Sequence, residues 1–227
     1  MIKAITMVRR ADGISRADFR SRYESDLVPV VEGLAAESHG YTRNHVVESL
    51  IPAGWEPNFD VVSSLWFGSR QELGRCQVAL KAELAGHASG IIDETTCRTA
   101  VFEERQSAVP RAPAAVREKV VLFVARRDLL TLDEFKVRYE TGHAVLAKKL
   151  MLPHLIRYVR NYVVESPTTG WRPDFDVMTE FWFDSIDTEL SKEEIQYLVR
   201  DEEVFMDRAT MRALRTEELG AGPGQRK

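Results

Sequence analysis

His143 is the residue whose type and spacing most clearly suggest chemistry in this sequence. It follows Phe135 and Tyr139 at intervals of four residues, so a helix over this segment would place the three side chains on one face. An imidazole among apolar groups needs a hydrogen-bond partner and titrates near neutral pH, as a general base must. We therefore take His143 as a candidate general base, with a purely structural core histidine as the alternative.

Polar residues on neighbouring segments could support this base. Tyr158 and Tyr162 alternate onto one face of a predicted strand, and Asn161 lies on the other face. Tyrosine and asparagine can donate hydrogen bonds to an oxyanion. Asp176, or Tyr139 on the helix, would position the imidazole. Each of these residue types is also ordinary in a mixed sheet, so a structural role stays open for each.

Other common catalytic and binding motifs do not occur. Asp176 and Glu180 are four strand residues apart, roughly 13 Å, which is too far for the carboxylate pair of a glycosidase. Cys76 and Cys97 form no CxxC motif, and no histidine pair has HxH or HExxH spacing. Nucleotide-binding, P-loop and serine-hydrolase motifs do not occur either. We expect no metal and no cofactor.

The composition excludes several classes of partner. The formal charge is −4, with 31 basic and 35 acidic residues interspersed, which argues against nucleic acid. No apolar run approaches the roughly 20 residues that cross a bilayer, so no membrane partner is expected. The N-terminal segment lacks the apolar core of a signal peptide, and two cysteines suit a reducing compartment. We expect a cytoplasmic protein.

The elements that must position these residues occur twice in the 227 residues. Residues 41–49 match residues 158–166 at seven of nine positions, and residues 54–69 match 170–185 at nine of sixteen. Such self-similarity indicates a tandem duplication. The first-half position equivalent to His143 is Leu27. The counterparts of Tyr139, Tyr158, Tyr162, Asp176 and Trp182 are Tyr23, Tyr41, His45, Asp60 and Trp66.

Each half is predicted to follow a βαββαβ order, which is the ferredoxin-like pattern. The second helices are expected over 71–90 and 188–208, and the final strands over 97–104 and 211–218. Because both helices of such a unit cover one sheet face, two units can cover each other's open faces. We predict an α+β fold in which two ferredoxin-like repeats form an intramolecular pseudo-dimeric α+β barrel. The expected units are 1–105, a linker 106–117, 118–219 and a flexible tail 220–227.

The second half resembles the EthD family, named for ethyl tert-butyl ether degradation, within the dimeric α+β barrel superfamily. The similar segments are DEFKVRYETGH (133–143), RYVRNYVV (157–164), FDVMTEFWFDS (175–185) and RDEEVFMD (200–207). The last segment contains the family's Asp-Glu pair as Asp201 and Glu202. The first half is similar only through DFRSRYE, YTRNHVV and FDVVSSLWF.

The family's His-x-Pro element is divided between the halves. His143 is present in the second half with Val145 in place of the proline, whereas Pro29 is present in the first half with Leu27 in place of the histidine. The resemblance therefore implies that the second half is the active one. The first half would be degenerate, structural or adapted to another ligand.

The resemblance implies an apolar cavity between sheet and helices. Fungal relatives in the family are similar to cofactor-free dehydratases or decarboxylases. We therefore expect a cofactor-independent lyase for a small aromatic or polyketide-like compound, with His143 as the base and Phe135, Trp182 and Phe123 against the substrate. The alternatives are a cofactorless monooxygenase and a non-catalytic small-molecule-binding or accessory protein. Further pairing into a homodimer of pseudo-dimers stays open.

Overall fold

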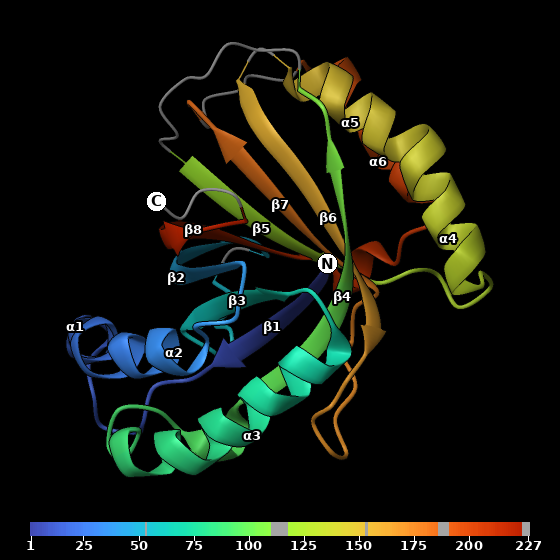
Figure 1. Ribbon diagram of the computed structural model, residues 1–227. Helices are drawn as coiled ribbons and strands as arrows, with labels where there is room; N and C mark the ends of the chain where they lie inside the picture. The colour runs from blue at the N-terminus through green and yellow to red at the C-terminus, as the bar shows by residue number, and fades with distance from the viewer. Residues whose placement is uncertain (53, 110–117, 153, 186–190, 224–227) are drawn as a thin grey trace.

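The computed structural model describes residues 1–52, 54–109, 118–152, 154–185 and 191–223. Its centre is a closed barrel of antiparallel strands in the order β1-β3-β2-β8-β5-β7-β6-β4 (Figure 1). The strands are β1 (Ile2–Val8), β2 (Gly40–Ile51), β3 (Val61–Phe67), β4 (Arg98–Ser107), β5 (Glu118–Val124), β6 (Leu155–Glu165), β7 (Val177–Phe183) and β8 (Arg212–Ala221).

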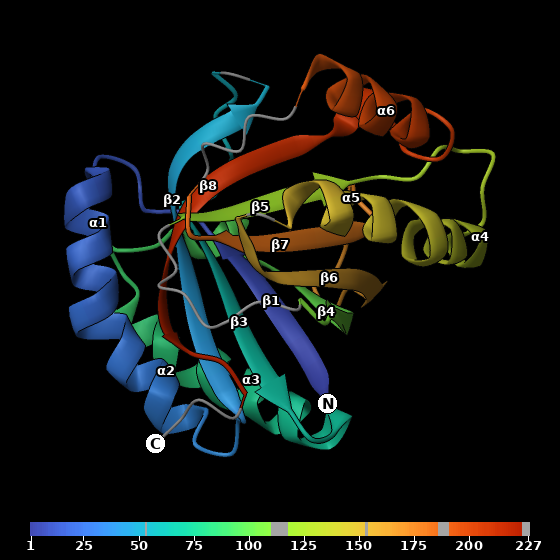
Figure 2. The same cartoon turned by 90° about the horizontal axis from the view of Figure 1, so that it is seen from above.

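The two halves contribute four strands each, with the same pairing pattern. β1 pairs with β3 and β4 in the first half, and β5 pairs with β7 and β8 in the second. The halves join edge to edge, because β2 pairs with β8 and β4 pairs with β6 (Figure 2). This closure satisfies the backbone groups that a single four-stranded sheet would leave free at its edges.

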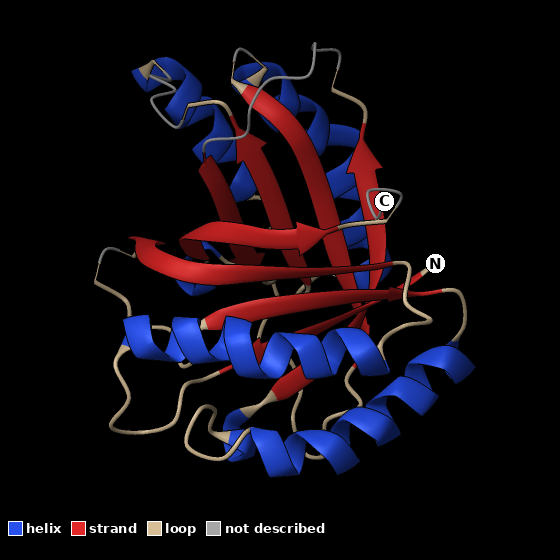
Figure 3. Ribbon diagram, turned by 60° about the vertical axis from the view of Figure 1, so that its left-hand side comes forward, coloured by secondary structure: helices blue, strands red, loops and turns tan. Residues whose placement is uncertain are grey.

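The helices cover the outside of the barrel, with each half covered by its own (Figure 3). Capping explains where several begin: the Ser15 side chain accepts from the Asp18 backbone, and Thr131 forms a capping box with Glu134. The helices are α1 (Arg16–Arg22), α2 (Val28–Leu34) and α3 (Arg70–His87) in the first half, and α4 (Leu132–Arg138), α5 (Ala144–Met151) and α6 (Lys192–Glu202) in the second.

A single π turn interrupts the first helix of each half, between α1 and α2 and between α4 and α5. These turns are Tyr23–Leu27 and Tyr139–His143. Pro29 follows only the first of them, so a proline is not required for the turn. Such turns are frequent at functional sites in proteins. Here each one carries the aromatic and apolar residues that face the sheet.

The core lies in two kinds of layer. Inside the barrel, apolar residues of both halves pack together, including Phe59, Phe123 and Phe175. Outside the barrel, each half has an apolar layer between its strands and helices. Strand alternation produces both layers, since successive residues point to opposite faces.

A charged cluster crosses the barrel interior beside the apolar core. Glu180 is 1% exposed and accepts from Lys3 Nζ at 2.6 Å and Lys119 Nζ at 2.7 Å. Burial opposes its ionisation, but the two lysines outweigh it and hold the Glu180 pKa well below its ordinary value. Lys3 belongs to the first half and Lys119 to the second, so Glu180 links the halves.

The observed boundaries differ slightly from those expected. Residues 106–107 of the expected linker extend β4, and residues 220–221 of the expected tail extend β8. The expected helix 188–208 is observed only as Lys192–Glu202. Residues 188–190, 110–117 and 224–227 lie outside the described part of the chain. None of the helices in that part is long and apolar enough to cross a membrane.

Candidate functional site

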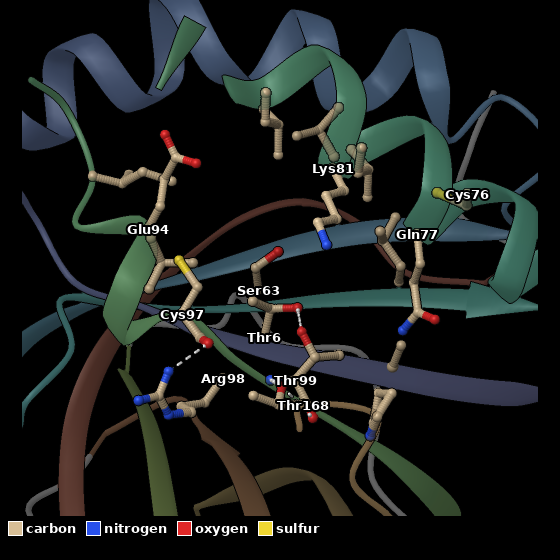
Figure 4. A pocket seen from close by; sticks show the side chains of 18 of the residues that line it. Thr6, Ser63, Cys76, Gln77, Lys81, Glu94, Cys97, Arg98, Thr99 and Thr168 are labelled. Carbon is tan, nitrogen blue, oxygen red and sulfur yellow. Dashed lines mark hydrogen bonds between the residues drawn. The ribbon is translucent and has the colours of Figure 1, made fainter. Parts of the chain in front are cut away.

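A cavity of about 620 Å³ lies in the first half, between the outer face of the sheet and the helices. This volume is within the range of roughly 300–1,000 Å³ typical of small-molecule pockets. The sheet forms one wall and α3 the opposite wall (Figure 4). Most of the wall is apolar, formed by Ala4, Val8, Leu27, Val31, Leu65, Phe67, Leu73, Leu80, Leu84 and Ile92.

Three hydroxyl groups give the apolar cavity a polar patch. Tyr23 Oη and Tyr41 Oη lie 3.5 Å apart, and Ser63 also lines the cavity. Burial raises the pKa of both tyrosines, and it raises the pKa of Tyr23 to well above the ordinary value. These phenols therefore stay protonated at neutral pH and can donate hydrogen bonds to a ligand oxygen.

The second half completes the cavity with the loop between β6 and β7. Pro167, Thr168 and Thr169 of this loop line the cavity. Thr168 Oγ1 accepts from the Thr99 backbone N–H at 2.9 Å and donates to the Thr99 carbonyl at 3.3 Å. Thr99 Oγ1 in turn lies 2.9 Å from Thr6 Oγ1. The cavity is thus built from both halves.

Two cysteines line the same cavity, but neither is poised as a nucleophile. Burial raises the pKa of Cys76, and it raises the pKa of Cys97 to about 11. The thiolate is the reactive form of cysteine. Both side chains are therefore neutral thiols near pH 7 and add to the apolar surface of the site.

The equivalent space in the second half is filled by larger side chains. Thr6 and Leu65 of the first half correspond in register to Leu122 and Phe181 of the second. Phe181 stacks on Tyr158 with ring centroids 4.7 Å apart. In the same way, Phe205 takes the place of Ile91, because the carbonyls of the two residues accept equivalent backbone hydrogen bonds. Met211 takes the place of Cys97, because each residue follows a short 3₁₀ helix.

His143 lies within this filled layer. It is 4% exposed, and its ring packs against Tyr139 and Phe205 at centroid distances of 5.0 and 5.6 Å. Its Nδ1 is 2.9 Å from Asp201 Oδ2. Desolvation lowers the His143 pKa although Asp201 opposes the shift, so the imidazole is neutral at pH 7. His143 does not line the first-half cavity.

The predicted companions of His143 fall into two groups. Tyr139, Tyr158 and Tyr162 lie on the helix side with it. The Tyr139 hydroxyl lies 3.0 Å from Thr179 Oγ1, and the Tyr162 hydroxyl donates to Glu140 at 2.7 Å. The Tyr158 hydroxyl is buried and has no hydrogen-bond partner among the described residues.

The other two lie elsewhere. Asn161 faces the barrel interior and donates to Glu180 at 2.8 Å, because its position alternates away from the tyrosines. Asp176 does not position His143, which corrects our expectation. It accepts from the backbone and guanidinium of Arg126, and Asp201 takes the expected role.

The predicted substrate-contacting aromatics do not share one site. Phe135 packs beside Tyr139 on the helix side, whereas Phe123 and Trp182 face the barrel interior, where Trp182 donates to Glu218 at 3.0 Å. The helix and the strands therefore send these rings to opposite sides of the sheet.

Of the first-half counterparts, Tyr23 and Tyr41 line the cavity. The other three make structural contacts: His45 with Glu24, Asp60 with Arg10, and Trp66 with Glu104.

Most residues of the cavity could not be recognised from sequence motifs, above all Leu65, Ser63 and Thr6. The available signal was a difference in size between equivalent positions, because Leu65 and Thr6 align with the bulkier Phe181 and Leu122. Catalytic motifs are defined by chemical groups, so they carry no information about side-chain volume. Among the described residues, no group of three or more His, Cys, Asp or Glu side chains could hold a metal ion.

Comparisons with known proteins agree with this architecture. A family model described as "EthD domain" matches residues 127–209. A search of curated protein sequences gave no match. Three solved structures share the fold over nearly their whole length. They are an anthrone oxidase-like protein (TM-score 0.61, 12% identity, covering 97% of this chain and 93% of that one), a candidate monooxygenase from Lactobacillus acidophilus NCFM (0.57, 9%, 99% and 97%) and a candidate chlorite dismutase (0.51, 12%, 95% and 94%).

Proposed function

We propose that this protein is a small-molecule-binding protein whose ligand occupies the first-half cavity. The match of residues 127–209 to the EthD domain model and the α+β barrel fold support this proposal. The ligand is a mostly apolar compound, aromatic or polyketide-like, with at least one hydroxyl or carbonyl group. The main observation in support is a difference between the halves in the layer between sheet and helices. This layer is open in the first half, and in the second half it is filled by Phe181, Phe205, Leu122 and Met211.

The two halves would then have different tasks. We treat them as copies of one ferredoxin-like unit, because their strand pairing is the same. The second copy closes the barrel, supplies the Thr168 loop and has a solid core. The first copy holds the ligand.

The polar groups of the cavity favour binding over acid–base catalysis. Its described lining contains no imidazole, and its one carboxylate, Glu94, is exposed to solvent. Tyr23, Tyr41 and Ser63 would orient a ligand oxygen through neutral hydrogen bonds, each contributing about 1 kcal/mol. A lyase needs a base beside the substrate, and the first-half position of the family's histidine is Leu27.

Filling the cavity tests this proposal. Leu65→Phe installs the residue that fills the equivalent space in the second half. With 2-naphthol as the probe, calorimetry should show binding to the wild type and at least tenfold weaker binding to Leu65→Phe. Phe181→Leu is the matched control, since it removes bulk from the other half and should not weaken naphthol binding. Wild-type protein that does not bind naphthol or related phenols, or a Leu65→Phe variant that binds equally well, would refute the proposal.

A second candidate function is the lyase activity predicted from the sequence. The specific observation in its favour is the His143–Asp201 pair, in which a neutral imidazole is oriented by a carboxylate. This reaction would require Tyr139 and Phe205 to move and admit a substrate. If it occurs, His143→Ala should lower turnover of an aromatic substrate at least about a hundredfold with the fold intact. Unchanged turnover in that variant would exclude the assignment.

A further inference from the structure

We propose that the ligand of the first-half cavity carries a carboxylate, and that Lys81 at the mouth of the cavity binds it. This inference rests on the proposed function, since it names the class of ligand for the same cavity. The ligand is then an aromatic acid whose apolar body lies between the sheet and α3. Its carboxylate lies at the open side, beside the α3 lysine.

The first observation is the placement of the Lys81 side chain. Lys81 is on α3, and its ammonium extends from the helix into the cavity above Ser63 (Figure 4). Within the described part of the chain, Lys81 makes no hydrogen bond or ion pair. A cation that projects into an apolar-walled cavity without a protein partner is available to a ligand anion.

The second observation is the balance of charge around the cavity. Its charged lining residues are Lys81, Arg98 and Glu94, two cations and one anion. Arg98 donates to the carbonyls of Thr95 and Cys97. A monoanionic ligand would bring the charge of this lining to zero.

The third observation separates Lys81 from features that both halves share. Arg212, the counterpart of Arg98, donates to the carbonyls of Ala209 and Met211 in the same manner, so this arginine arrangement belongs to the fold. Phe205 is the second-half equivalent of Ile91. Lys81 lies ten residues before Ile91, and the residue ten positions before Phe205 is Ile195. The lysine therefore occurs only in the half that has the cavity.

A pair of probes that differ mainly in charge tests the inference. 2-Naphthoate and its neutral analogue 2-naphthamide have similar shapes, and their affinities can be measured by calorimetry at low and high salt. The wild type should bind the carboxylate about three- to tenfold more tightly than the amide, a modest preference because Lys81 is solvent-exposed. Added salt should reduce the preference.

Substitution of the lysine assigns the preference to one residue. Lys81→Gln should remove the preference for naphthoate and leave the naphthamide affinity unchanged. Lys149→Gln, which removes an exposed lysine from α5 in the other half, should keep the preference. Thermal unfolding of both variants checks that the fold is retained.

The outcomes distinguish this inference from the function on which it rests. Equal affinities of the wild type for both probes, or an unchanged preference in Lys81→Gln, would overturn the carboxylate assignment while the cavity stays a binding site. Binding of neither probe, or binding that Leu65→Phe does not weaken, would overturn the proposed function and this inference with it.

Discussion

His143 and His45 are both buried beside a carboxylate, one in each half. His143 Nδ1 lies 2.9 Å from Asp201, and His45 Nε2 lies 2.6 Å from Glu24. Desolvation outweighs the carboxylate in both cases and lowers each pKa. In the pH range in which these two histidines of the unfolded chain already bind protons, the folded protein therefore keeps both imidazoles neutral.

This difference predicts an acid-dependent loss of stability. As pH falls below about 6.5, the unfolded state takes up protons that the folded state does not, so the free energy of unfolding decreases. Each histidine contributes at most about 1.4 kcal/mol per pH unit. Urea unfolding of His143→Gln between pH 7.5 and 5.5 should show a smaller decrease than the wild type. The exposed His87→Gln should behave as the wild type does, and an equal slope in all three proteins would contradict the explanation.

Among the structural elements, the π turns show what apolar spacing alone can predict. Phe135, Tyr139 and His143 are all buried, as their spacing of four residues predicts. The interval Tyr139–His143 is nevertheless a π turn rather than regular α-helix. A repeat of apolar residues specifies which face is buried but not whether a turn contains one extra residue.

The β6–β7 loop is the element by which one half shapes the other's site. Thr168→Val keeps the size of the side chain but removes both hydrogen bonds to Thr99, leaving the Thr99 N–H without its partner. We expect the affinity for 2-naphthol to fall about three- to tenfold, since one such bond contributes about 1 kcal/mol. Thr141→Val, on the helix of the second half, is the control and should bind normally. Unchanged binding by Thr168→Val would show that the loop does not shape the site.

The whole molecule depends on contacts that cross between the halves, of which the Glu180 cluster is the most buried. Glu180→Gln leaves Lys3 and Lys119 with less compensation in the barrel interior. We expect the free energy of unfolding to fall by about 3–5 kcal/mol, measured by urea unfolding.

A second pair that crosses between the halves provides the control for Glu180. Glu217 binds Arg20 of the first half but is 51% exposed. Glu217→Gln should therefore cost no more than about 1 kcal/mol. Similar losses in Glu217→Gln and Glu180→Gln would mean that burial does not govern this network.

The amino-acid sequence by itself determined the repeated order of elements, the α+β class, the resemblance of the second half to EthD domains and the buried face that carries His143. These follow from local periodicity and self-similarity, which need no knowledge of packing. Only the tertiary structure decided where space is left. The cavity depends on the combined volumes of residues that are distant in sequence, such as Leu65 against Phe181, and on a loop from the opposite half. Local patterns record the type of a side chain but not whether its neighbours fill the space beside it, so His143 came to lie in a filled layer and Tyr23 beside an open one.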